Sequence, residues 1–185
     1  MEQTHGGGDR MSTDAKGYTL MELVVTLTLI VVLATLVIPG WAALLGAQRL
    51  AATTNTLVQA LTAARFEAVK RGEGMVLCPS ADGRTCTETP YHRGWLLRPA
   101  PNTPSALEQQ APVLRTWPDP TGAVDIHTGA GLARYVAYRP DGQTRQLNGA
   151  LQMGSFRLCH GERGRRVIIS RTGRVRVERT PCTVE

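Results

Sequence analysis

The residues best able to do chemistry in this chain of 185 residues are its cysteines and a group of arginines near the C-terminal end. Four cysteines occur, none of them in a C-x-x-C pair: Cys78, Cys86, Cys159 and Cys182. An even number predicts two disulfide bonds in an oxidising compartment. The sequence does not determine their connectivity, but pairing Cys78 with Cys86 and Cys159 with Cys182 closes two local loops and is favoured. Zinc binding with help from His92 or His160 is the alternative, although the spacing fits no standard zinc pattern.

Arginine is concentrated between residues 157 and 179, where eight arginines stand beside only two glutamates. This stretch supplies much of the net charge of +6. A guanidinium group suits phosphate and releases counterions when it binds a nucleic-acid backbone, so the pattern indicates DNA contacts that do not depend on base sequence. The candidates are Arg171, Arg174, Arg176 and Arg179. The alternative is a solvated strand face without a ligand, and the stretch lacks interleaved aromatic residues that stack on single-stranded bases.

The register of the strand pair that carries these arginines is open. In residues 174–177 arginine alternates with valine, which places both arginines on one face of a strand. A two-residue turn at Thr172-Gly173 would set Ile169 beside Arg176 and spoil a purely basic face. A three-residue turn would avoid this pairing, and the sequence does not decide between the two.

No group of residues predicts catalysis. The four histidines stand apart in polar or loop contexts, at His5, His92, His127 and His160. No Ser-His-Asp arrangement, phosphate-binding glycine loop or metal-ligand cluster is recognisable. We therefore expect a protein that is not an enzyme and that has no catalytic residue, no cofactor and no metal.

The first structural element that the sequence predicts is a helix in an apolar run near the N-terminus. Residues 23–47 are 25 residues without a charged side chain, which is enough to cross a bilayer of about 30 Å. Glu22 stands at the start of this run, where an ionised carboxylate beside lipid is costly. A secretory signal peptide would be cleaved after its apolar core, whereas here Gly17 precedes the run. A buried helix of a soluble core is the other alternative.

Beyond the run, the pattern predicts a longer helix and then a β region. Apolar residues recur at helical spacing as one stripe, at Leu50, Leu57, Leu61, Ala64 and Ala68. Gly72 is a suitable end for this helix. Short β-prone runs separated by turn residues follow, near residues 75–78, 94–97, 113–117, 123–126, 135–139, 154–159, 167–170 and 174–177. The predicted fold class is α+β, with the helix packed against an antiparallel β-sheet.

The octet "KGYTLMEL" at residues 16–23 resembles the cleavage and methylation motif of type IV prepilins and pseudopilins. Tyr18 replaces the phenylalanine that is commoner in that family, and Pro39 matches the family's kinked helix. The resemblance implies that a membrane-embedded prepilin peptidase cuts after Gly17 and methylates the new amine of Tyr18. It also implies that Glu22 faces the free N-terminus of a neighbouring subunit in a filament.

Three further stretches are similar to the GspH/FimT-type minor pilins and minor pseudopilins. They are "ARFEAVKRG" at residues 64–72, "GWL" at 94–96 and "ISRTGRVR" at 169–176. Together with the octet they span most of residues 17–179. Within the last stretch, "GRVR" at residues 173–176 matches a G-R-x-R motif of FimT-like pilins that bind DNA during natural transformation.

The resemblance implies an organisation into four segments. Residues 1–17 would be a cleaved leader, 18–45 a transmembrane or filament-core helix, 46–72 its amphipathic continuation and 73–185 a periplasmic β domain. Before assembly the chain would be a single-pass protein of the bacterial inner membrane. After assembly it would lie in an extracellular or periplasmic filament.

The implied function is filament assembly or initiation near the tip of a type IV pilus or of a type II secretion pseudopilus. Its partners would be major and minor pilins or pseudopilins, and the prepilin peptidase of which it is a substrate. Double-stranded DNA is a partner in the alternative, in which the protein is a DNA-binding minor pilin for DNA uptake. A membrane-anchored periplasmic domain without a filament role is the third hypothesis. The sequence does not separate pilus from secretion system.

Overall fold

The computed structural model describes residues 17–101, 103–118 and 124–182, and for residues 36–40 and 42 it describes the backbone alone. The predicted leader therefore falls, except for Gly17, outside the described residues, and the predicted kink at Pro39 falls among the side chains that are not described. Contacts divide the chain into two units, Met1–Ala42 and Ala43–Glu185, and helix α1 (Leu20–Arg71) contributes to both. The described part of the chain contains no helix with the combined length and hydropathy of a membrane span.

In the first unit, α1 begins with a capped turn. The Glu22 N–H donates to Thr19 Oγ1 at 3.3 Å, so Thr19 is the N-cap residue and satisfies one of the free donors of the first turn. Further along, threonine hydroxyls donate to helix carbonyl oxygens three residues earlier, and the donors are Thr26, Thr28 and Thr35. These bonds satisfy polar groups inside an apolar helix without water.

In the second unit, α1 carries the apolar stripe that the sequence predicts. Leu57, Leu61, Ala64 and Ala68 are all fully buried. The helix ends at Arg71, and Gly72 follows with φ +67° and donates to the carbonyl oxygen of Ala68. A left-handed residue just after a helix favours glycine because it has no Cβ. The predicted end of the helix at Gly72 is confirmed.

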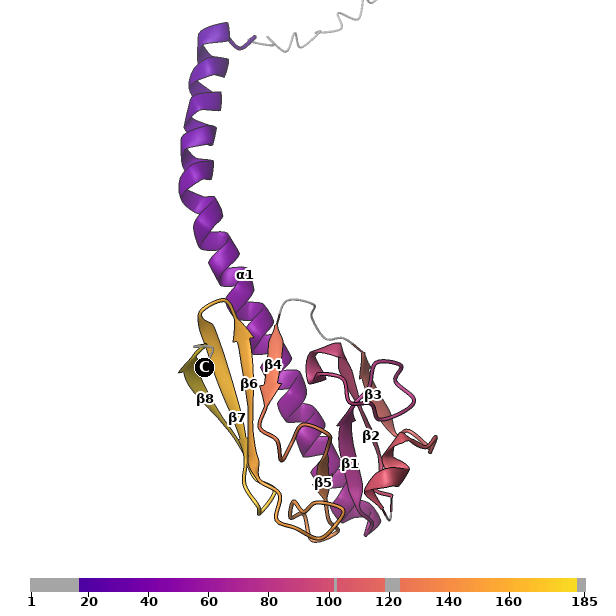
Figure 1. Cartoon of the computed structure of the whole chain (residues 1–185). Helices are drawn as coiled ribbons and strands as arrows, with labels where there is room; N and C mark the ends of the chain where they lie inside the picture. The colour runs from indigo at the N-terminus through magenta and orange to yellow at the C-terminus, as the bar shows by residue number, and fades with distance from the viewer. Residues whose placement is uncertain (1–16, 102, 119–123, 183–185) are drawn as a thin grey trace, which may run out of the picture. The chain divides into compact units, whose positions relative to one another are not determined.

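Eight strands follow among the described residues, and each overlaps a predicted β run. They are β1 Met75–Pro79, β2 Gly94–Pro99, β3 Arg115–Pro118, β4 Asp125–Thr128, β5 Val136–Tyr138, β6 Gly154–His160, β7 Arg163–Ile169 and β8 Val175–Pro181. They form two antiparallel sheets, with strand orders β3-β2-β1-β5 and β4-β6-β7-β8. Figure 1 shows both sheets against the C-terminal part of α1. The predicted α+β fold is confirmed, with two sheets.

Both sheets share one apolar core with the helix. The stripe on α1 packs with side chains of the first sheet, such as Trp95 and Val136, and of the second, such as Phe156 and Val167. A smaller core covers the other face of the first sheet, around Val76, Leu96 and the disulfide-bonded Cys78. Strands β1, β2 and β5 of the first sheet are therefore buried on both faces, whereas its edge strand β3 is largely exposed.

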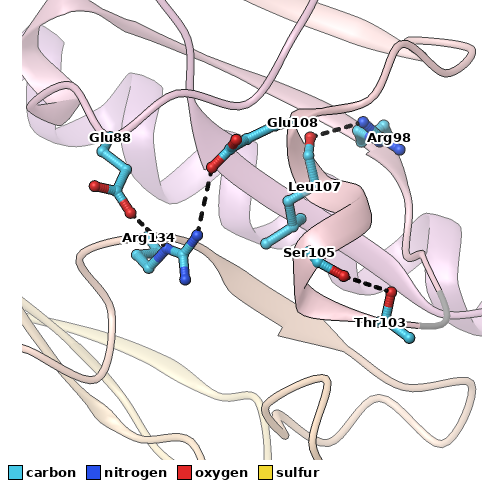
Figure 2. Close-up of polar contacts among 7 residues, drawn as sticks. All are labelled: Glu88, Arg98, Thr103, Ser105, Leu107, Glu108 and Arg134. Atoms are coloured by element: carbon cyan, nitrogen blue, oxygen red, sulfur yellow. Dashed lines mark hydrogen bonds and ion pairs between the residues drawn. The ribbon is translucent and has the colours of Figure 1, made fainter.

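A buried arginine fixes the proline-rich segment after β2. Arg98 is only 3% exposed, and its Nη1 donates to the carbonyl oxygens of Leu107 and Gln109 at 3.1 and 2.7 Å. Burial lowers the pKa of its guanidinium group. Figure 2 shows this contact beside the short 3₁₀ helix η2 (Pro104–Glu108), whose Glu108 forms an ion pair with Arg134. The proline-rich segment, which has no regular strand among its described residues, is therefore fixed by the hydrogen bonds from Arg98 to Leu107 and Gln109.

Candidate functional site on the second sheet

The strand pair β7–β8 carries the arginines and is closed by a three-residue turn. The Ser170 N–H donates to the Arg174 carbonyl oxygen at 3.1 Å, and Gly173 ends the turn with φ +74°. A left-handed glycine at the end of a three-residue loop is a common hairpin geometry. The register places Val175 opposite Ile169 and sets Arg176 opposite Ile168. Of the two turns that the sequence leaves open, the structure has the three-residue one.

The buried residue Thr144 fixes the turn through hydrogen bonds to its backbone carbonyl groups. The Thr144 N–H donates to the Arg171 carbonyl oxygen at 3.0 Å. The Thr144 hydroxyl lies 2.7 Å from the Gln152 carbonyl oxygen and 3.0 Å from that of Ser170. Thr144 is fully buried, so these bonds form in a water-free setting where leaving a polar group unpaired is costly. The turn therefore presents its exposed arginines from a fixed backbone.

The four DNA-binding candidates do not form one surface. Arg171 and Arg174 are exposed at the turn. Side chains alternate along β8, so Arg176 and Arg179 project from opposite faces of the sheet. Arg176 pairs with Glu178 through Nε and Oε1 at 3.1 Å, and both side chains are largely exposed. An exposed ion pair of this kind contributes little to stability and leaves the guanidinium accessible.

Arg179 belongs instead to a groove between the helix and the second sheet. The groove has a volume of about 530 Å³ and is lined by Ala47 and Leu50 of α1 and by Arg163, Arg165 and Arg179 of the sheet, among others. Arg163 Nη1 donates to the carbonyl oxygen of Ala43 at 3.2 Å, which ties the β6–β7 turn to the helix. The groove is therefore cationic on the sheet side and apolar on the helix side.

Two disulfide bonds brace the second unit. Cys78 is bonded to Cys86, and Cys159 to Cys182. This is the local pairing that the sequence favours, and it leaves no free thiol among these residues for the zinc alternative. Inside the first loop, backbone N–H groups of Thr85 and Arg84 donate to the Asp82 carboxylate and hold its pKa well below the usual range.

The Cys159–Cys182 disulfide bears directly on the arginine-rich sheet. It links the end of β6 to the residue just after β8, across the intervening strand β7. The Cys182 N–H also donates to the Glu162 carbonyl oxygen at 3.1 Å. The end of β8 that carries Arg179 is therefore tied down twice.

The residues of the N-terminal motif lie at the start of α1. Gly17 to Thr19 precede the helix, and Tyr18 is 84% exposed. Glu22 is exposed in the first turn, where a carboxylate also complements the helix dipole. The spacing of Thr19 and Glu22 is that of a capping box, so the pair has a local role in starting the helix. The predicted cleavage, methylation and assembly roles of Gly17, Tyr18 and Glu22 stay predictions.

Sequence reasoning did not single out Arg163 and Arg165 among the arginines. Both lie on the same face of β7 as the buried Val167 and Ile169. The alternation of side chains along a strand could have predicted this. Arg163 and Arg165 are separated from Val167 and Ile169 by even numbers of residues, so all four share one face. Extending this alternation to β8 required the turn length, which the sequence left open.

The fold and the N-terminal helix define a class, that of the type IV pilin-like proteins. A family model described as type II transport protein GspH matches residues 53–173. The chain belongs to this family.

Two solved structures of the type IV minor pilin FimU from Pseudomonas aeruginosa, in different crystal forms, are similar in fold. The first has a TM-score of 0.55 at 18% identity, and the match covers 71% of this chain and 89% of the FimU chain. The second has a TM-score of 0.50 at 18% identity and covers 67% and 88%. At this identity the likeness concerns the fold alone. No curated protein matches the chain in sequence.

Proposed function

We propose that this protein is a minor pilin or minor pseudopilin that acts in filament assembly or initiation, near the tip of a type IV pilus or a type II secretion pseudopilus. The observation that carries the proposal is the octet at residues 16–23, whose last residue is the first of 25 uncharged residues, in a chain of the GspH family. Its partners would be other pilins or pseudopilins, and a prepilin peptidase would process it. Residues 18–45 would anchor it in the inner membrane before assembly, with the second unit in the periplasm.

Glu22 is the residue that we propose to act in assembly. A free amine at Tyr18 of one subunit and the Glu22 carboxylate of another carry opposite charges. Desolvating two opposite charges together costs less than desolvating either alone, and breaking such a pair is expensive. The capping position of Glu22 offers a purely local role, which a test must separate from the role in assembly.

We expect the chain, expressed with a prepilin peptidase, to yield a mature protein that begins at N-methylated Tyr18. Mass spectrometry of the purified protein measures this directly. Gly17→Val should retain the leader, because a branched side chain at the cleaved position blocks the cut. Glu22→Gln should be processed normally but be missing from sheared filaments, since it keeps the side-chain size and loses the charge. A chain whose mass is the same with and without the peptidase contradicts the proposal.

A second candidate function is DNA binding through Arg171, Arg174 and Arg176. Two observations support it: these side chains are exposed at and beside the turn, and the turn is fixed by buried hydrogen bonds from Thr144. Arg179 lies on the other face of the strand and is not part of this surface. Contacts of this kind would go to phosphates, so affinity would fall with salt and vary little with sequence.

For this function we expect Arg174→Ala/Arg176→Ala to weaken binding of a 20-base-pair duplex to the full chain in detergent micelles. If both arginines contact phosphates, the slope of log affinity against log salt should fall by about 2. Fluorescence anisotropy at several salt concentrations measures it. The matched control is Arg84→Ala/Arg93→Ala, which removes the same charge from exposed arginines elsewhere in the unit. Equal affinity in both double variants removes the assignment.

A further inference from the structure

The groove between α1 and the second sheet contains an uncompensated charge. Arg165 and Arg179 lie directly opposite each other across β7 and β8, and Arg163 lies two residues along on the same face. Like charges directly opposite in a sheet destabilise it. Glu162 is the carboxylate that lines the groove, and among the described residues it forms no ion pair with these arginines. An anionic group bound between Arg165 and Arg179 would offset their repulsion.

The hydrogen bonds at both ends of the β7–β8 pair determine which type of cross-strand pair Arg165 and Arg179 form. Ser170 bonds to Arg174 at one end, and Cys182 bonds to Glu162 at the other. Antiparallel pairs alternate between hydrogen-bonded and non-hydrogen-bonded, so the hydrogen-bonded positions of β8 and its flanks are the even ones. Arg165 and Arg179 therefore form a non-hydrogen-bonded pair, the kind in which opposing side chains lie closer.

The same alternation leaves the outer edge of β8 open. This strand is the last of its sheet, as Figure 1 shows. The backbone N–H and C=O groups of Val175, Val177 and Arg179 point away from β7, and within the described residues no hydrogen bond reaches them. Val177, which lies on the same face of β8 as Arg179, is also 43% exposed. An unpaired edge strand is a template for pairing with another chain.

We propose that this edge and groove bind an extended, acidic segment of a partner protein. The segment adds to β8 as a fifth strand, antiparallel to it. Its groove-side carboxylates meet Arg179 and, behind Arg179 on β7, Arg165 and Arg163. Guanidinium groups bind carboxylates through paired, charge-assisted hydrogen bonds, and strand addition supplies main-chain bonds beside them. The apolar floor at Ala47 and Leu50 suits the aliphatic part of such a chain.

Shape favours a single extended chain over duplex DNA at this place. The site is a groove beside an open strand edge, and its arginines line the sheet side of that groove, opposite Ala47 and Leu50 of the helix. A duplex carries its phosphates on the outside of a wide rod and would meet the exposed arginines at the β7–β8 turn instead. The inference stands on the second unit alone and does not depend on filament assembly.

The geometry also predicts which backbone N–H groups of the partner segment donate hydrogen bonds to β8. Residues directly opposite in a sheet share a face, so partner residues opposite Val177 and Arg179 place their side chains in the groove. Because these are hydrogen-bonded positions at the open edge, the same partner residues point their N–H groups at β8. In a peptide TEVEVEVT, N-methylation of the glutamates should therefore block binding. N-methylation of the valines should leave the bonds to β8 intact.

The test is a titration of the full chain in detergent micelles with the fluorescein-labelled peptide TEVEVEVT. Arg165→Gln/Arg179→Gln should weaken binding about tenfold or more, because it removes charge-assisted bonds. Arg171→Gln/Arg174→Gln removes the same charge from the turn and should leave affinity within about twofold. The peptide TQVQVQVT and the version methylated at glutamate should bind at least about tenfold more weakly than the parent.

Several outcomes overturn the proposal. Equal losses in the two double variants show a nonspecific charge effect, and equal binding of both methylated peptides excludes strand addition. If Arg165→Gln/Arg179→Gln weakens binding of a labelled 20-base-pair duplex and not of the peptide, the groove binds nucleic acid. Urea denaturation of the same variant separates a structural role: relief of the like-charge pair should leave the midpoint unchanged or raise it. A lower midpoint with unchanged peptide affinity of the folded protein assigns the arginines to stability and overturns the inference.

Discussion

Replacing Gln152 by glutamate is expected to destabilise the second unit by about 4 kcal/mol at neutral pH. Gln152 is 1% exposed and every polar atom of its side chain is used. Its Oε1 accepts from the Ala137 N–H at 2.8 Å, and its Nε2 donates to the carbonyl oxygens of Gly131 and Tyr135 at 3.0 and 2.8 Å. A carboxylate keeps the first bond but turns a negative oxygen toward two carbonyl oxygens. It therefore loses two donors and adds repulsion in a buried setting.

The penalty should depend on pH in a defined direction. Burial against two acceptors raises the pKa of the introduced carboxyl group above its unfolded value of about 4.3. Between these two pKa values the folded state holds more protons than the unfolded state, so stability falls as pH rises. The slope should be about −1.4 kcal/mol per pH unit in this window, flattening above the folded pKa. The variant should therefore approach its greatest stability near pH 4.

Gln152→Met is the matched control, because it has a similar size and no charge. It should lose about 2–3 kcal/mol through unpaired partners, with no added dependence on pH relative to the wild type. Urea denaturation followed by the fluorescence of the buried Trp95 measures both variants from pH 4 to pH 8. A Gln152→Glu variant whose stability parallels that of Gln152→Met across this range would show that the side chain is not enclosed by these carbonyl groups.

Elements with a local cause could be predicted from the sequence. The buried stripe from Leu57 to Ala68 follows from helical spacing, and the helix end follows from a glycine in a left-handed conformation at residue 72. Each β run became a strand because β-prone residues were bounded by turns. The disulfides were favoured correctly because each joins cysteines that are near each other in sequence, 8 and 23 residues apart.

The division into two sheets could not be predicted, because it rests on pairing between strands far apart in sequence. β5 returns to β1 of the first sheet, while β4 before it pairs with β6 of the second. The hydrogen bonds of Thr144 and Gln152, which join these parts, come from a stretch that reads as loop and has no periodic pattern. The separation of Arg176 from Arg179 likewise depends on β8 continuing to Pro181, beyond the predicted run 174–177, and the opposition of Arg165 and Arg179 depends on the turn length.

Replacing Gly173 by alanine is expected to cost about 3 kcal/mol or more, or to force the β7–β8 turn to rearrange. Its φ of +74° disfavours any residue with a Cβ by about 1–2 kcal/mol. Space is a second obstacle: an added Cβ would collide with the Gly142 carbonyl oxygen and lie 3.1 Å from Tyr138 Cε1. A backbone oxygen cannot move aside cheaply. The Tyr138 ring is itself fixed by burial, which also raises the pKa of its phenol.

Gly149→Ala is the matched control, because Gly149 has a similar φ of +86° and nothing within 4 Å of an added Cβ. It should cost only the backbone term of about 1–2 kcal/mol. The difference between the two variants in urea denaturation therefore isolates the close approach of the turn at residue 173 to the turn at residue 142. Equal losses would show that the two turns are not in contact.

The result also decides how the first residue of the "GRVR" stretch should be interpreted. If Gly173→Ala loses both stability and DNA affinity while Arg174→Ala/Arg176→Ala loses DNA affinity alone, the glycine acts by shaping the turn and the arginines by contacting phosphate. Gly173 is the buried residue of the turn, and an added Cβ would lie 3.3 Å from Arg65 Nε. A glycine so enclosed has no surface to offer a ligand. Its part in the motif is therefore to hold Arg174 and Arg176 where solvent, and any anionic partner, can reach them.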